Sequence, residues 1–229
     1  MGYSVDMIQS GFNPLRHGFR FPNQFKLDLF SRVQLPFVNE KKFNELIYGL
    51  CGGMCYSALD YFHNHQKIPG ISNVSEINHL LFSYLWQRQL DSLQGKTLFK
   101  MAQWMTLEDE RIASLVLEEE VPKILALIRR KEPVVLVIIR VSGFFRSMQN
   151  HQVVAVEYKH DLLSQSLSLG LYDPNHPGVT PTISIGLNKL DRIKHFQQST
   201  GERIRGFFVI PYQKQIPSYT LEEKRLNKN

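Results

Sequence analysis

The chain has 229 residues, of which 43% are hydrophobic and 21% are charged. This composition is typical of a globular protein and argues against disorder, and the length suits one sizeable domain or a core domain that carries an insertion. The formal net charge is +6 at pH 7. The basic residues are scattered, however, and form no stripe interleaved with aromatics, which argues against a nucleic-acid partner.

The cysteines and the apolar runs indicate the compartment. Only two cysteines occur, Cys51 and Cys55, so a disulfide framework is excluded and a reducing compartment is favoured. Residues 1–12 have no apolar core of the kind that a secretory signal needs. The longest apolar run, residues 134–139, is much shorter than the ~20 residues of a membrane-spanning helix. We therefore expect a soluble, cytoplasmic protein with no membrane span, and the sequence leaves its oligomeric state open.

The N-terminal part is expected to change from irregular to helical. Residues 1–40 are rich in Phe, Pro and Asn without sustained periodicity and predict an irregular arm. A helix is predicted from about 51 to 64 because apolar residues recur there at helical spacing. Its buried face would carry Cys55, Ala58, Leu59 and Phe62.

Two further helical regions are predicted before residue 131. Residues 75–117 are expected to be helical throughout. Another helix is expected to start near residues 118–120, which are three glutamates, with Pro122 in its first turn. Basic residues at 129–131 would end this helix, since acidic starts and basic ends both complement the helix dipole.

Beyond residue 133 the pattern is typical of strands. The β-branched run at 134–141 predicts a strand buried on both faces. Because helices come first and a mostly antiparallel sheet follows, the fold class is α+β. We divide the chain into the arm (1–40), a domain at 41–215 with a helical insertion at about 75–117, and a polar tail at 216–229. The other expected strands cover residues 151–158, 166–172, 183–187 and 205–212.

Cys51 is a candidate nucleophile because it opens the predicted helix between glycines, in Gly49-Leu50-Cys51-Gly52-Gly53. A helix N-terminus lowers the pKa of a thiol, and the thiolate is the nucleophile. The glycines would leave room for a substrate carbonyl and free N–H groups for an oxyanion. Alternatively, Cys51 is simply a small buried apolar residue.

A zinc site is the other alternative for the cysteines. Cys51 and Cys55 could bind zinc with His63 and His65. The histidines lie at the far end of the same helix, beyond the reach of one tetrahedral site. We therefore expect no metal and no cofactor.

His151 and Asp173 are candidates to act with the cysteine. Of eight histidines, only His151 leads directly into a predicted buried strand, and the next strand ends in Asp173-Pro174. If the two strands form a hairpin, Asp173 lies beside His151, where a carboxylate can fix the tautomer of an imidazole. Alone, Asp-Pro is a common turn initiator.

Together, these segments resemble the papain-like cysteine peptidase superfamily over about residues 45–212. The order Cys51, His151, Asp173 matches its Cys, His, Asn/Asp order. Cys-Gly at a helix start, His-x-Val-Val-x-x-x-Tyr and Asp-Pro at a strand end are most similar to the bacteriocin-processing (double-glycine leader) peptidases. The resemblance implies a papain-like fold, with the nucleophile helix packed on the antiparallel sheet.

The resemblance also implies a function. Cys51 would attack a peptide or protein substrate, His151 would act as base and then as acid, and Asp173 would orient His151, which makes the chain a thiol-dependent peptidase or amidase. An acyltransferase, a transglutaminase-like enzyme or a deamidating enzyme would use the same residues. A non-catalytic papain-fold module that binds a peptide is the remaining alternative.

Three departures from the family pattern leave parts of the site open. Cys55, followed by Tyr56, could imitate the papain motif, but it falls a full turn inside the helix. Glu45 stands where related enzymes have an oxyanion glutamine, and the alternative donors are Asn23, Gln24 and Asn44. The long Cys51–His151 spacing allows the insertion at 75–117, together with the loop at 142–147, to cover the cleft.

Overall fold

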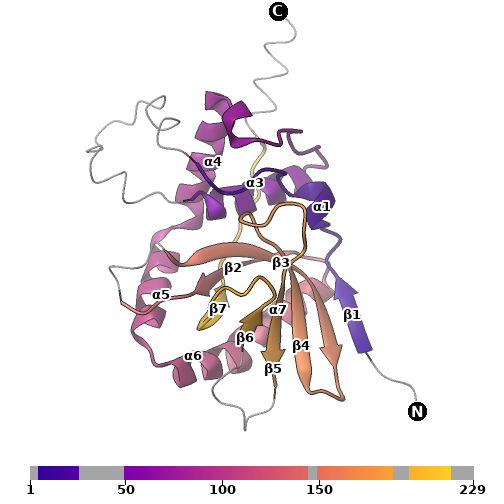
Figure 1. The fold of residues 1–229 in the computed structure, drawn as a ribbon, viewed down its shortest axis with the longest axis vertical. Helices are drawn as coiled ribbons and strands as arrows, with labels where there is room; N and C mark the ends of the chain where they lie inside the picture. The colour runs from indigo at the N-terminus through magenta and orange to yellow at the C-terminus, as the bar shows by residue number, and fades with distance from the viewer. Residues whose placement is uncertain (1–4, 26–48, 144–148, 188–195, 218–229) are drawn as a thin grey trace, which may run out of the picture.

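The computed structural model describes residues 5–25, 49–143, 149–187 and 196–217. Helices fill the chain between residues 51 and 129, and an antiparallel sheet follows (Figure 1). The predicted α+β class is thus confirmed. Asn44, Glu45, most of the 142–147 loop and most of the C-terminal tail lie outside the described residues.

The first helices pack on one another beside the sheet. Helix α3 packs along α4, and α5 contacts β2. The region expected to be helical throughout is divided by short breaks at 77–78, 93–94 and 107–108. The elements are α3 (Cys51–His63), the 3-10 helix η2 (Val74–Glu76), α4 (His79–Ser92) and α5 (Gly95–Thr106).

The helix expected to start near residues 118–120 is present as α7, with Pro122 in its first turn and its end at Arg129, but it continues an earlier helix instead of starting separately. Helix α6 (Asp109–Leu115), a π-helical segment (Val116–Glu120) and α7 (Val121–Arg129) follow one another without a break. A proline inside a helix removes an N–H and crowds the preceding turn. The wider turn just before Pro122 fits this disturbance, because Val121 N–H bonds to Val116 O, five residues back. The acidic run therefore lies inside the helix.

Glu120, the last residue of that run, is buried and links three elements. Its Oε1 accepts hydrogen bonds from Lys100 and Lys123, and its Oε2 accepts one from the backbone N–H of Val209. A buried carboxylate is tolerated when it is paired and hydrogen-bonded in this way. The glutamate thus fastens the long helix to α5 and to the last strand.

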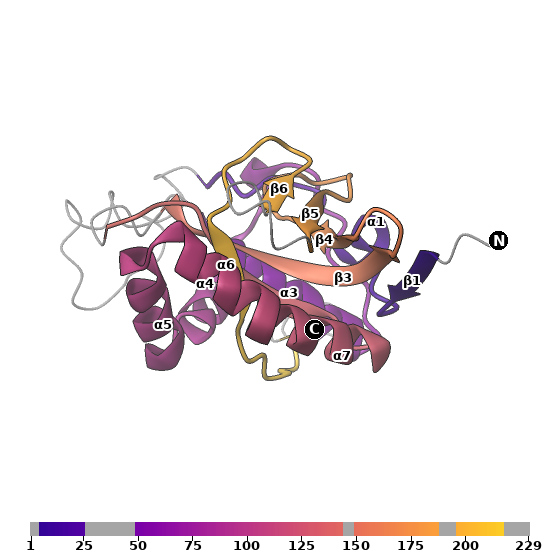
Figure 2. The same cartoon turned by 90° about the horizontal axis from the view of Figure 1, so that it is seen from below.

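The sheet is antiparallel throughout its described part, in the order β6-β5-β4-β3-β2-β7, with β1 paired to β3. Strand β2 is buried along its whole length, as its β-branched run predicts. The strands are β2 (Val134–Ile139), β3 (His151–Asp161), β4 (Ser166–Tyr172), β5 (Thr182–Gly186), β6 (Phe196–Gln198) and β7 (Gly206–Val209). Figure 2 shows the continuous α6–α7 helix running under the curved sheet.

In its described part, residues 5–25, the N-terminal arm is not wholly irregular as predicted, because it contains a strand and a short helix. Strand β1 (Val5–Gln9) pairs with the second half of β3, while β2 pairs with the first half. A short helix, α1 (Pro14–His17), follows and is capped by the Asn13 side chain. Helix α1 contacts α3, so the described part of the arm packs on the rest of the domain. In the described part of the chain no helix is long and apolar enough to cross a membrane.

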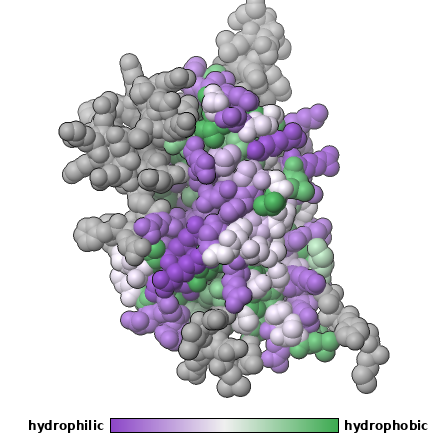
Figure 3. Space-filling view, viewed as in Figure 1, coloured by the Kyte–Doolittle hydropathy of each residue, from purple (hydrophilic) through white to green (hydrophobic). Residues whose placement is uncertain are grey.

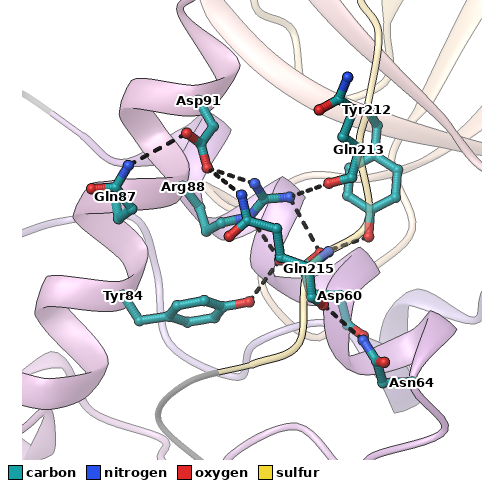
Figure 4. Close-up of polar contacts among 9 residues, drawn as sticks. All are labelled: Asp60, Asn64, Tyr84, Gln87, Arg88, Asp91, Tyr212, Gln213 and Gln215. Atoms are coloured by element: carbon teal, nitrogen blue, oxygen red, sulfur yellow. Dashed lines mark hydrogen bonds and ion pairs between the residues drawn. The ribbon is translucent and has the colours of Figure 1, made fainter.

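A buried ionic cluster joins α3, α4 and the segment after β7 (Figure 4). Asp60 on α3 and Arg88 on α4 are almost completely buried, with 2.7 Å between Asp60 Oδ2 and Arg88 Nε. Three further donors reach the Asp60 carboxylate, and Arg88 also donates to a backbone carbonyl. These partners are Tyr84 Oη, Tyr212 Oη and the Gln215 N–H for Asp60, and Gln213 O for Arg88.

Candidate active site

Cys51 is the first residue of α3, and Asn23 holds the turn that precedes it. The Asn23 side-chain oxygen accepts the Leu50 N–H at 2.6 Å, although Leu50 itself has no side chain that could cap the helix. Gly49 is required by this arrangement, because a Cβ there would lie 2.3 Å from Asn23 Nδ2. The segment from the N-terminal arm therefore fixes where the thiol stands.

The two glycines after Cys51 are explained by packing rather than by room for substrate. A Cβ on Gly53 would lie 2.1 Å from the backbone oxygen of Leu85, and one on Gly52 would lie 2.1 Å from Ser92 Oγ. The Gly53 N–H donates to Gln89 Oε1 at 2.8 Å. Helix α4 thus lies directly against the first turn of α3.

His151 and Asp173 meet as the predicted hairpin requires. Tyr172 pairs with Val154, so Asp173, one residue further, lies beside the start of β3. His151 Nε2 and Asp173 Oδ1 are 2.6 Å apart, and both side chains are buried. Since Nε2 faces the carboxylate, Nδ1 is the ring nitrogen left for the thiol.

The Asp173 carboxylate has two other donors, which the sequence analysis missed. The Asn175 N–H donates to Oδ1 at 2.9 Å, and Gln198 Nε2 donates to Oδ2 at 3.1 Å. Gln198 is buried on β6. Nothing local in the sequence marks it, because β6 comes beside Asp173 only through the order of strands in the sheet.

Electrostatics favour an ionised cysteine–histidine pair. Burial opposes the imidazolium, but the charge and hydrogen bond of Asp173 outweigh it and raise the pKa of His151 to about 9. Burial likewise opposes the thiolate, but hydrogen bonding and charge from His151, with backbone hydrogen bonds from Gln152 and Gly52, leave the pKa of Cys51 lowered. The structure therefore brings Cys51, His151 and Asp173 together as one coupled group.

Cys55, the alternative nucleophile, lies in an environment of the opposite kind. It is completely buried, and its Sγ lies 3.5 Å from the Gln152 carbonyl oxygen. Burial, followed by the charges of Cys51 and Asp173, raises its pKa well above the usual thiol value. A protonated, enclosed thiol is a poor nucleophile, so the geometry favours Cys51.

The three oxyanion candidates fare differently. The side-chain oxygen of Asn23 accepts the Leu50 N–H, and its Nδ2 donates to Asn175 Oδ1 at 3.1 Å. Asn23 therefore links the N-terminal arm to the turn before α3 and to the segment after β4, and its Nδ2 is already used. Gln24 is exposed, and its side chain makes no hydrogen bond within the described ranges. Asn44 is outside those ranges. The backbone N–H of Cys51 has no hydrogen-bond partner among the residues described and is a further donor for an oxyanion.

The four residues considered for a zinc site, Cys51, Cys55, His63 and His65, do not come together in the structure. His63 closes α3 and His65 follows it, at the end opposite Cys51. Within the described part of the chain, no three His, Cys, Asp or Glu side chains form a group that could hold a metal ion.

In comparisons with protein families, with curated proteins and with solved structures, no match to this chain is found.

Proposed function

We propose that this chain is a papain-like, thiol-dependent hydrolase that cleaves a peptide or amide bond in a peptide or protein. The observation that carries the proposal is the 2.6 Å contact between His151 and Asp173 beside a Cys51 thiol whose pKa is lowered. A merely structural cysteine has no need of a charged histidine and an oriented carboxylate.

The chemistry would proceed in two acyl-transfer steps. The Cys51 thiolate attacks the substrate carbonyl carbon, and the Cys51 N–H faces the negative charge that develops on the oxygen. The His151 imidazolium then gives its proton to the leaving amine, which leaves an acyl thioester on Cys51. In the second step His151 takes a proton from water, whose oxygen attacks the thioester and releases the carboxylic acid and the Cys51 thiolate, which restores the ionised Cys51–His151 pair. Asp173 holds the imidazole tautomer throughout.

The test is the rate at which iodoacetamide alkylates Cys51 at pH 6, followed by mass spectrometry. The native protein should be labelled at Cys51 and not at Cys55. His151→Ala should slow the labelling at least about tenfold, because the thiol then returns towards its ordinary pKa. His79→Ala is the matched control, since His79 is exposed at the start of α4. Labelling confined to Cys55 would refute the assignment.

A second measurement separates hydrolysis from its alternatives. The protein is incubated with a peptide mixture in the presence and absence of a primary amine, and products are identified by mass. Hydrolysis predicts new carboxyl termini that require Cys51. Amide products formed with the amine would instead indicate an acyltransferase. If Cys51 is labelled but no peptide bond is cleaved or exchanged, the chain is a binding module.

A further inference from the structure

A basic pocket lies at the end of α3 opposite the candidate active site. It has a volume of about 710 Å³ and lies between α1 and the segment that follows α3. From Cys51 to Phe62, which lines the pocket, α3 rises about 16 Å. Arg16, Arg20 and Lys67 line it together with two histidines, and no acidic residue does.

No described residue pairs with the three cations of this pocket, Arg16, Arg20 and Lys67. The side chains of Arg16, Arg20 and Lys67 make no hydrogen bond or ion pair with any residue that the structure describes. By contrast, Arg88 and Arg205 each donate to a carboxylate. Like charges around one hollow repel one another, and an anion in the hollow would relieve that repulsion. Figure 3 shows hydrophilic residues at the upper right of the view, next to a smaller hydrophobic patch.

The pocket also offers an apolar wall and oriented polar atoms. Phe62 and Ile68 line it and pack against the core, and the His17 ring lies 5.0 Å from the Phe62 ring. His17 Nδ1 accepts the Asn13 N–H at 2.9 Å, so in the neutral ring Nε2 carries the proton and is a donor. Gln66 also lines the pocket, and its buried Oε1 has no hydrogen-bond partner in the described structure.

We propose that this pocket binds a small organic phosphate, with the phosphate on Arg16, Arg20 and Lys67 and an aromatic or apolar group on Phe62 and Ile68. Guanidinium groups match phosphate oxygens in pairs, and lysine adds a point charge. The volume falls within the range of small-molecule sites. A nucleoside phosphate has this chemistry: several negative charges and a flat ring.

Isothermal titration of the full chain with ADP, adenosine and inorganic pyrophosphate tests the proposal. ADP should bind more tightly than either of the other two, and its affinity should fall between 50 and 200 mM salt, about the range over which phosphate contacts lose strength. The triple variant Arg16→Gln, Arg20→Gln, Lys67→Gln should bind ADP at least about tenfold more weakly, since each charge-assisted hydrogen bond contributes on that scale.

The matched control carries the same change of charge elsewhere. Lys96→Gln, Arg111→Gln, Lys159→Gln removes three exposed cations that do not line the pocket and should leave ADP binding unchanged. Equal weakening in both triple variants would overturn the site, and pyrophosphate binding as tight as ADP would overturn the apolar contact. Cys51 alkylation should be unaffected by either triple variant, so this proposal and the proposed function fail independently.

Discussion

At the scale of single residues, Gln198 matters most beyond the three groups of the candidate active site. It donates to Asp173 Oδ2, the oxygen that does not contact His151. A carboxylate held by two or three donors keeps its charge and its orientation. Gln198 is therefore a positioning residue, which acts on Cys51 only through Asp173 and His151.

We predict that Gln198→Ala shifts the pH profile of Cys51 alkylation upward by less than about one pH unit. A hydrogen bond to a charged group contributes ~1.5 kcal/mol, about one unit in the pKa of its direct partner Asp173, and only part of this reaches the thiol through His151. The sign follows from the chain of contacts. Without the donor the pKa of Asp173 rises, its support for the His151 imidazolium weakens, and the Cys51 thiolate is less favoured. The profile is measured from pH 5 to 9.

Gln197→Ala is the control, because Gln197 is exposed on the same strand. An unchanged profile in Gln198→Ala, with the fold intact by circular dichroism, would show that the hydrogen bond does not reach the thiol.

Sequence reasoning finds the site residues only where local signals exist. Cys51 is marked by a helix start and glycines, and His151 and Asp173 by the ends of two adjacent strands in one hairpin. The sequence does not reveal Gln198, because its contact with Asp173, at the end of β4, reaches across the intervening strand β5. The sequence suggests Asn23 only as a possible oxyanion donor, whereas in the structure its side-chain oxygen accepts the Leu50 N–H in the turn before α3.

At the scale of elements, the close approach of α4 to the first turn of α3 determines the surroundings of the thiol. Gly53 permits this approach, since a side chain there would meet the Leu85 carbonyl. That obstacle is backbone, so the helices themselves would have to separate.

We predict that Gly53→Ala destabilises the protein by about 3 kcal/mol, the upper part of the range for overpacking a close-packed interior. Gly95→Ala is the matched control, because Gly95 also lies in a helix but a Cβ there meets nothing within 4 Å. This control should be neutral or stabilising by up to about 1 kcal/mol, since alanine is the better helix former. Urea unfolding measures both, and equal midpoints for the two variants would contradict the packing account.

The elements that sequence reasoning missed have tertiary causes. Strand β1 is five residues long and contains two polar residues, so its sequence shows no clear apolar periodicity. It forms because it can pair with the second half of β3. The three glutamates at 118–120 imitate a helix start. Pro122 is carried inside the helix by a π turn, a local rearrangement that neither propensity nor periodicity reveals.

At the scale of the whole molecule, the Asp60–Arg88 cluster holds distant parts of the chain together. It joins α3, α4 and residues 212–215 through a carboxylate and a guanidinium that solvent does not reach. Such a pair is expensive to bury, and its full set of hydrogen bonds is what makes it tolerable.

We predict that Arg88→Met destabilises the protein by about 3–5 kcal/mol, because it leaves the Asp60 charge buried without its partner. Arg111→Met should change the stability by less than about 0.5 kcal/mol, as for most surface substitutions, since Arg111 is exposed. Urea unfolding monitored by tryptophan fluorescence gives both values. A loss below about 1 kcal/mol for Arg88→Met would show that Asp60 finds other compensation.

The order of elements, from helices to antiparallel strands, is readable along the chain because each element carries its own period. The cluster is not readable, because Asp60, Arg88 and Tyr212 lie in three separate segments and no single pattern relates them. From the sequence alone, charged residues in a helix such as Asp60 and Arg88 would be assigned to its solvent-exposed face, whereas the fold buries both.

The same cluster has a consequence for the timing of synthesis. Cys51 and the rest of α3 leave the ribosome long before residues 212–215, yet Asp60 obtains two of its donors only from that last segment. Strand β6, which carries Gln198 to Asp173, also arrives late. A nascent chain that ends before these residues lacks two of the hydrogen-bond donors to Asp60 and the Gln198 donor to Asp173. The contacts of the candidate active site are thus completed only when almost the whole described chain has been made.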